Sequence, residues 1–286
     1  MAENQYLAPA EIATVALRTA ETKAAAGAGQ LLALGLIAGV FIGLAAQGSN
    51  MAAYNLLANP ATYGLGRSLV GVTFGTGLML ILVAGGELFT GNCLMILGPL
   101  EKRFAWPAML RNWALVYLGN FIGSQLIVWL IYASGLLNSS AGLLGGMTAK
   151  IAASKVSLSF GQALASGILC NLPVCGAVWM SYGAKDIISK LGVCFFPVWL
   201  FATSGFEHSV ANMYFIPAGI LAAANPTWTA AAGLDAAADL AGLTWGNFFT
   251  KNLFPVTIGN ILGGACLVGG VYWFCYLRGK NKTQAS

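Results

Sequence analysis

The sequence predicts an all-α membrane protein whose six transmembrane spans form two inverted repeats of three spans, with the second and fifth spans broken. Composition is the first reason: 58% of the 286 residues are hydrophobic and 8% are charged, against roughly 25% charged in an ordinary soluble domain. The second reason is the number and length of the apolar runs. The third is an internal repeat that pairs the two halves of the chain.

Several apolar runs reach the ~20 residues that a helix needs to cross about 30 Å of hydrocarbon. The six predicted spans lie near 29–48, 68–98, 112–136, 159–183, 190–224 and 252–277, and they define a pore domain at 29–277. The second and fifth runs are too long for one plain crossing and are interrupted, at 84–92 and at 204–212. The polar connection 225–250 is expected to be a loop.

Residues 1–28 lack a signal-peptide pattern. They are predicted to form a weakly amphipathic cytoplasmic helix on the membrane surface, or else a hydrophilic lead-in to the first span. Residues 278–286 are predicted to be a basic cytoplasmic tail.

The distribution of basic residues predicts the orientation, because Lys and Arg accumulate on the cytoplasmic side. With six spans, both termini share one side with the second-to-third and fourth-to-fifth connections. That side carries Arg18, Lys23, Lys102, Arg103, Arg111, Lys185, Lys190, Arg278, Lys280 and Lys282, and the other carries Arg67, Lys150, Lys155 and Lys251. Ten basic residues against four place both termini in the cytoplasm of a multi-pass protein of the cell (inner) membrane.

The internal repeat is visible in two places. RNWALVYLGNFIG at 111–123 matches KNLFPVTIGNILG at 251–263, with a constant offset of 140 residues. The two interruptions also match, as GELFTGN and FEHSVAN. Each has a glutamate and an asparagine five residues apart with a hydroxyl between them: Glu87, Thr90 and Asn92, and Glu207, Ser209 and Asn212. Each repeat therefore has three spans, and because three is odd the second copy must insert upside down.

Polar groups at the interruptions indicate where a pore or site lies. Unpaired backbone groups cost several kcal/mol in lipid, so the breaks are expected to face protein or a cavity. Glu87 and Glu207 are the acids placed within spans, and an ionisable residue there marks a functional site by default. Because both lie beside a break, we expect their carboxylates to accept hydrogen bonds from the broken backbone, with Asn92 and Asn212 tying the loose ends.

His208 is the single histidine of the chain and has no counterpart in the first repeat. A purely structural residue would recur with the repeat, so the asymmetry indicates a functional role. Imidazole titrates near ~6.5 in water, and a nearby anion favours its charged form. His208 is therefore predicted to hydrogen-bond an anion or pass it a proton, with Thr90 as a second donor.

For the other candidate site residues, the residues alone allow two interpretations each. Lys155 either attracts anions to an external vestibule or snorkels at the membrane edge. Asn171 and Asn260 either orient a solute or tie broken ends together. Apolar residues near the breaks either pack or form constrictions; these are Phe74, Leu78, Leu88 and Phe201.

Four segments in order, GELFTGN, GILCNLPVCGAVWMSY, SGFEHSVANMYFIPAGI and NLFPVTIGNILGG, resemble the signature segments of the formate–nitrite transporter family. The resemblance covers nearly the whole chain. It implies an aquaporin-like fold with a pore through each protomer of a homopentamer. It also implies small monovalent anions as substrates: formate, nitrite or hydrosulfide.

The resemblance assigns roles to particular residues. His208 corresponds to the family's central histidine, Thr90 to its pore threonine and Lys155 to its vestibule lysine. Asn171 and Asn260 correspond to polar pore-lining asparagines. Two constrictions are implied, Phe74 with Phe201 on the outer side and Leu78 with Leu88 on the inner side.

The chain also departs from the family pattern. Pro173 stands where an aliphatic residue is usual, and Gly91-Asn92 resembles nitrite and hydrosulfide members. The segments NFFTKNLFPVTIGNILGG and YWFCYLR resemble formate channels instead. Formate is therefore predicted first, with nitrite or hydrosulfide as the alternative.

Two other classes fit less well. An aquaporin-type channel for neutral solutes is suggested by Asn59-Pro60-Ala61, but that triplet lies outside the interruptions. A membrane redox enzyme with bis-histidine haem needs two histidines. The six cysteines lie in or near spans and are expected to pack as small hydrophobes. We therefore expect no enzymatic activity, cofactor, metal or nucleic acid; the expected partners are the anion, protons and the lipid bilayer.

Overall fold

A computed structural model describes residues 6–279. The predicted tail at 278–286 lies outside these residues from position 280 on, as do Lys280 and Lys282. In chain order the helices are α1 (Pro9–Ala25), α2 (Ala28–Leu57), η1 (Pro60–Thr62), α3 (Tyr63–Met79), η2 (Leu80–Ala84), α4 (Phe89–Asn92), η3 (Cys93–Ile96), α5 (Leu97–Leu100), α6 (Trp106–Ala133), η4 (Leu136–Asn138), α7 (Leu143–Val156), α8 (Phe160–Gly183), α9 (Ile187–Ser204), α10 (Ser209–Ala223), α11 (Pro226–Ala231), α12 (Trp245–Asn247), η5 (Phe248–Leu253), α13 (Phe254–Ile261), η6 (Leu262–Gly270) and α14 (Val271–Tyr276).

The six predicted spans are confirmed. Within the described residues, six helices are long and apolar enough to cross a membrane: 28–57, 60–84, 106–133, 160–183, 187–204 and 245–276. Two shorter apolar helices, 89–100 and 209–223, follow the second and the fifth. The interruptions therefore lie inside the predicted second and fifth runs, as expected.

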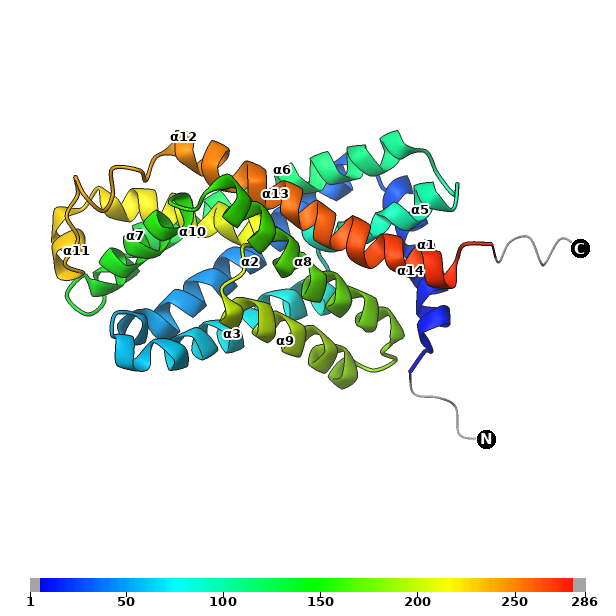
Figure 1. Cartoon of the computed structure of the whole chain (residues 1–286), viewed down its shortest axis with the longest axis horizontal. Coiled ribbons are helices and arrows are strands. Elements are labelled where there is room, and N and C mark those ends of the chain that lie inside the picture. Colours follow the sequence, from blue (N-terminus) through cyan, green and yellow to red (C-terminus); the bar gives the residue numbers. More distant parts are fainter. Residues whose placement is uncertain (1–5, 280–286) are drawn as a thin grey trace, which may run out of the picture.

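Several boundaries differ from the prediction. The first span ends at Leu57, nine residues later than predicted, because its polar residues Gln47, Ser49 and Asn50 are buried against protein. Hydropathy alone stops at such residues. Three helices were not expected: α7 precedes the fourth span, and α11 and α12 lie in the connection predicted to be a loop. Figure 1 shows α7 and α11 at the end of the molecule opposite to α1 and α14.

Helix α1 packs on the protein with one face, and its predicted position on the membrane surface stays a prediction. It buries Ile12, Ala13, Ala16, Leu17 and Ala20, and it contacts α8, α5, α14 and α6. In Figure 1 it lies beside α14, so the described ends of the chain share one end of the molecule. The apolar face of α1 is therefore taken up by other helices.

Close helix contacts explain part of the high glycine content. Helix α2 crosses α6 so closely that a Cβ at Gly39 would lie 2.2 Å from the carbonyl oxygen of Asn120. Small residues let backbones approach in this way, and dispersion contacts then stabilise helix pairs that have no hydrophobic driving force in lipid. This pair holds the first break in place, because Asn120 also bonds to it.

Each break begins at a glycine in a conformation that other residues rarely adopt. Gly85 has φ of 102° and Gly205 has φ of 84°. A side chain at either position would be strained. The chain turns at these points, so that α4 and α10 start inside the molecule.

One asparagine satisfies the backbone of each break. The amide group of Asn120 accepts from Phe89 N (3.0 Å) and donates to the carbonyls of Gly35 (2.8 Å) and Glu87 (2.9 Å). Asn260 does the same in the second half, accepting from Ser209 N (2.9 Å) and donating to Gly167 (2.8 Å) and Glu207 (3.1 Å). We refer to Asn120 and Asn260 as the bracket asparagines. They are 140 residues apart, which is the offset of the sequence repeat.

The recurring contacts extend the repeat beyond three spans. The side chain of Asn112 donates to the carbonyl of Lys23 in α1 (3.1 Å), and that of Asn252 donates to the carbonyl of Lys155 in α7 (2.9 Å). Helices α1 and α7 therefore take equivalent positions, each preceding the first long helix of its half. The inverted insertion of the two halves stays a prediction.

The bracket asparagines generate a prediction about stability. Asn260→Ala leaves the N–H of Ser209 and the carbonyl of Glu207 without partners, at a cost of about 1–3 kcal/mol for each orphaned group. We expect a clear fall in the melting temperature of the purified protein in detergent. Asn247→Ala is the matched control, because Asn247 bonds to one carbonyl in an exposed turn. Equal melting temperatures for the two variants would contradict the bracket role.

Candidate functional site

The two breaks meet at a small central chamber. Its wall is formed by Ile42, Phe74, Leu78, Leu88, Val174, Val198, Phe201 and His208. The cavity volume is about 10 Å³, close to the minimum that holds one water molecule. The structure thus brings all four predicted constriction residues together around His208. Ile42, Val174 and Val198 were not predicted, because an apolar residue in a span carries no signal that separates a pore wall from packing.

Aromatic rings close the chamber on one side. The rings of Phe74 and Phe201 meet edge to face, with centroids 5.8 Å apart, and each side chain is 3% exposed. The Phe201 ring stacks on the imidazole of His208 with centroids 5.9 Å apart. Any solute that reaches His208 past this pair must displace at least one ring. We refer to Phe74 and Phe201 as the outer constriction.

His208 has two hydrogen-bond partners that differ in kind. It is the N-cap of α10, where its Nδ1 accepts from the backbone N–H of Ala211 (3.0 Å). Its Nε2 lies 3.0 Å from the hydroxyl oxygen of Thr90. Because Nδ1 accepts, the proton of the neutral ring is on Nε2. The Nε2–H then donates to Thr90, which leaves the hydroxyl hydrogen of Thr90 available to an anion.

Asn171 and Asn260 lie next to this pair, but they differ in how many of their hydrogen-bonding atoms are already used. Asn171 Nδ2 donates to the carbonyls of Thr90 (3.1 Å) and Asn260 (2.7 Å), while its Oδ1 is buried without a partner among the described residues. Asn260 uses both ends of its amide group on backbone of the second half. The geometry therefore favours a structural role for Asn260, while pore lining by Asn171 and Asn260 stays a prediction.

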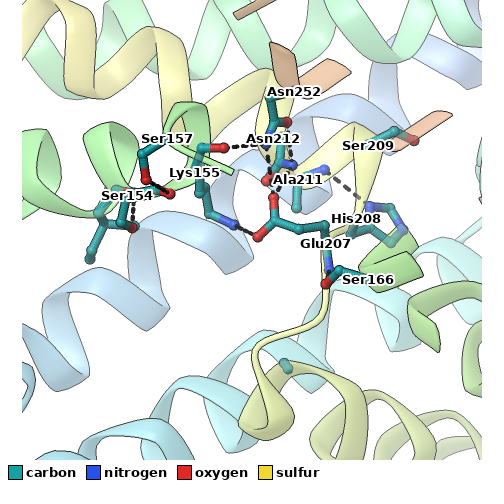
Figure 2. A network of polar contacts seen from close by, with 12 residues as sticks. Ser154, Lys155, Ser157, Ser166, Glu207, His208, Ser209, Ala211, Asn212 and Asn252 are labelled. Carbon is teal, nitrogen blue, oxygen red and sulfur yellow. Dashed lines mark hydrogen bonds and ion pairs between the residues drawn. The ribbon is translucent and has the colours of Figure 1, made fainter. Parts of the chain in front are cut away.

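Lys155 and Glu207 form an ion pair beside the second break (Figure 2). Lys155 Nζ lies 2.7 Å from Glu207 Oε1, and Glu207 Oε2 accepts from Asn212 Nδ2 (2.6 Å) and Asn252 Nδ2 (3.1 Å). Figure 2 shows these side chains converging on the carboxylate, while the backbone N–H of Glu207 donates to Ser166 Oγ at 3.0 Å. We refer to Lys155, Glu207, Asn212 and Asn252 as the outer cluster.

The first half contains the same arrangement. Lys23 Nζ lies 2.7 Å from Glu87 Oε1 and donates to Asn92 Oδ1 (2.8 Å). Asn92 Nδ2 in turn donates to Glu87 Oε2 (2.6 Å) and to Asn112 Oδ1 (2.8 Å). We refer to these four residues as the inner cluster. Its members match those of the outer cluster one by one.

The two clusters correct the expected role of the glutamates. Both carboxylates bind lysine and asparagine side chains, whereas the bracket asparagines satisfy the broken backbone. A carboxylate within a span needs a cation more than it needs amide donors, because an unpaired charge is costly there. Lys23, Asn112 and Asn252 were not predicted as site residues. The two asparagines had a signal, because each follows the basic residue that opens a repeat segment.

Lys155 also connects the outer cluster to the outer constriction. Its Nζ lies 5.3 Å from the centre of the Phe215 ring, and that ring stacks on Phe74 with centroids 6.5 Å apart. The ammonium group is thus held by an anion on one side and an aromatic face on the other. Lys155 therefore already has a counter-ion where it lies next to the outer constriction.

Comparison with known proteins identifies the group to which this geometry belongs. The family model described as formate/nitrite transporter matches residues 10–274. The chain belongs to the formate/nitrite transporter family. It is 40% identical to the formate channel FocA of Escherichia coli (strain K12) over 285 residues, which is 97% of this chain and 98% of that relative. It is 36% identical to a probable formate transporter of Methanothermobacter thermautotrophicus, over 96% and 99% of the two chains.

Solved structures agree with the family assignment. A pentameric formate channel with formate bound superimposes with a TM-score of 0.77 at 37% identity, covering 88% of this chain and 98% of that one. An FNT family ion channel gives a TM-score of 0.72 at 27% identity, covering 93% and 97%. The family recognised from the four sequence segments is therefore confirmed.

The paired clusters generate a prediction. Lys155→Met leaves the carboxylate of Glu207 without its cation, and breaking a buried pair in this way costs about 3–5 kcal/mol. We expect a lower melting temperature in detergent, and we expect Lys155→Met with Glu207→Gln to recover part of the loss because the unpaired charge is gone. Arg103→Met, which breaks the exposed pair of Arg103 and Glu21, is the control and leaves the melting temperature unchanged. A double variant less stable than Lys155→Met alone would contradict the ion-pair interpretation.

Proposed function

We propose that the chain forms a channel through which small monovalent weak-acid anions cross a membrane, with formate as the preferred substrate. The observation that carries the proposal is the Thr90–His208 pair: His208 is the polar residue in a chamber otherwise lined by apolar side chains, and its Nε2 lies 3.0 Å from the Thr90 hydroxyl. Family membership and the relatives described as formate channels support the choice of substrate. Homologous channels and transporters also support a role without a chemical transformation.

The chamber favours a small solute. Formate has three heavy atoms, so modest rotation of the constriction side chains admits it, and the apolar wall offers few groups to replace the hydration shell of an ion. The Thr90 hydroxyl hydrogen is the donor offered to the substrate, because the Nε2–H of His208 is donated to the Thr90 oxygen. The substrate passes there either as the anion or as the acid formed by transient protonation.

Assembly and orientation are part of the same proposal. We infer a homopentamer, because the similar solved structure is described as a pentameric channel. We place both termini in the cytoplasm of a cell (inner) membrane protein. The described ends lie at one end of the molecule (Figure 1), and ten of the fourteen basic residues fall on the side of the termini in the predicted topology. The outer cluster then faces the exterior, with Lys155 in the external vestibule.

Nitrite or hydrosulfide as the substrate is the alternative within the family. Both anions are as small as formate and are conjugate bases of weak acids, so the chamber dimensions alone do not separate the three. The Gly91-Asn92 pair, which resembles nitrite and hydrosulfide members, does not line the chamber. Asn92 belongs to the inner cluster and Gly91 faces Val178.

Flux into proteoliposomes tests the proposal. His208→Asn keeps an N-cap for α10 but removes the Nε2 donor, so we expect formate flux to fall by about 10- to 100-fold, the equivalent of one hydrogen bond to a charged group. Thr90→Val is expected to behave alike, and Thr90→Ser to retain most flux because the hydroxyl remains. Full flux in His208→Asn would overturn the role of the pair, and faster nitrite or hydrosulfide flux in the wild type would overturn the choice of formate.

A further inference from the structure

Arg67 connects the two helices that carry the outer constriction. It lies on α3, and its Nε donates to the carbonyl of Thr203 (3.2 Å) while its Nη2 donates to the carbonyl of Ala202. Both acceptors are on the last turn of α9. Phe201 directly precedes them, and Phe74 lies seven residues after Arg67, two turns along α3 on the same face. One guanidinium group thus bridges the helices just above the Phe74–Phe201 contact.

The bridge lies where α9 needs a partner. The last carbonyls of a helix have no N–H partner within the helix. Here the chain leaves α9 through Gly205. Gly205 N–H donates to Ala202 O (3.2 Å) and Phe206 N–H to Phe201 O (3.2 Å), which leaves Thr203 O for Arg67. The positive group at a helix carboxyl end is also favoured by the helix dipole.

Tight packing makes the bridge part of a rigid pair. A Cβ at Gly71 would lie 2.3 Å from Thr203 Oγ1, so α3 and α9 already touch one turn below Arg67. A Cβ at Gly205 would lie 3.1 Å from Arg67 Nη2. Separation of the two helices would break both guanidinium bonds, so the backbone positions behind Phe74 and Phe201 are fixed together.

Among the described residues, the bridge has no equivalent at the first break. The corresponding position, 120 residues on, is Ile187, which is 62% exposed and has no side-chain donor. The bracket asparagines and both clusters recur, so a residue needed only to close a break would recur as well. Arg67 occurs on the side where the aromatic constriction and His208 also lack equivalents.

We propose that Arg67 is a positioning residue that sets the width of the outer constriction and thereby the largest anion that passes. With α3 and α9 held together, the backbones behind Phe74 and Phe201 stay at a fixed distance, and a solute passes only if the two rings rotate. Without the guanidinium bonds the end of α9 can move away from α3, and the distance between the two rings increases. This inference rests on the channel function proposed above.

The test compares formate with acetate, which is larger by one methyl group, in proteoliposomes containing the full chain. In Arg67→Met, which keeps the apolar stem, we expect the ratio of acetate to formate flux to rise about three- to tenfold, because a widened constriction gives up part of the roughly 10- to 200-fold by which a tight pocket discriminates one methylene. Arg67→Lys keeps the charge but offers a point donor in place of a fork, so an intermediate ratio is expected. Lys150→Gln is the control, because it removes one exposed external charge away from the constriction.

Other results would overturn the proposal. If Arg67→Met lowers both fluxes equally, or if Lys150→Gln shifts the ratio as much, then Arg67 acts through folding or charge and not through width. Amide hydrogen exchange at 203–206 supplies a second readout that needs no flux: faster exchange in Arg67→Met, with 85–88 unchanged, supports the bridge, and unchanged exchange overturns it. A wild type that moves neither anion would instead overturn the proposed function and leave this exchange measurement to decide the bridge.

Discussion

The structure depends on how two helices can begin inside a membrane protein without leaving backbone groups unpaired. Water is absent at that depth, so every free N–H or C=O must find a protein partner. Asn120 and Asn260 meet this constraint with one side chain each, since an amide group both accepts and donates. The paired clusters then neutralise the glutamates that stand at the same breaks. Only with the backbone settled in this way can α4 and α10 point their first residues at a common chamber.

The recurring contacts separate what supports the fold from what serves transport. Chamber residues occupy equivalent positions: Leu78 and Val198, like Leu88 and His208, are 120 residues apart. The scaffold preserves residue type between the halves, and the chamber does not. His208 replaces an aliphatic residue, and Phe201 stands opposite Ile81 in the repeat. The symmetric frame therefore carries an asymmetric lining, in which one side is aromatic and polar and the other is aliphatic.

The sequence predicted much of this because some constraints are local. Apolar length predicted the spans, and the spacing of Glu87 with Asn92 and of Glu207 with Asn212 located both breaks. It did not predict that Lys23 and Lys155 pair with these glutamates, since the partners are 64 and 52 residues apart and only folding brings α1 and α7 to the clusters. The residue type of Asn260 fits pore lining and a structural role equally well, and its three bonds to backbone groups favour the structural role. Helix α7 was missed because a short helix of small residues resembles a loop by composition.

The N-cap of α10 has a consequence for how an anion crosses. A proton can reach Nδ1 of His208 only if the bond from Ala211 N–H is given up, because a protonated Nδ1 would face another donor. Loss of an N-cap costs about 0.5–2 kcal/mol, in addition to the cost of a buried cation. The fold therefore selects the neutral ring with its proton on Nε2, aimed at Thr90. A neutral donor attracts an anion without trapping it as a fixed charge would, so weak binding at the narrowest stretch is compatible with release on either side. If the substrate crosses as the acid, the lowest free-energy route is for it to enter already protonated. His208 then orients the substrate without changing its own charge.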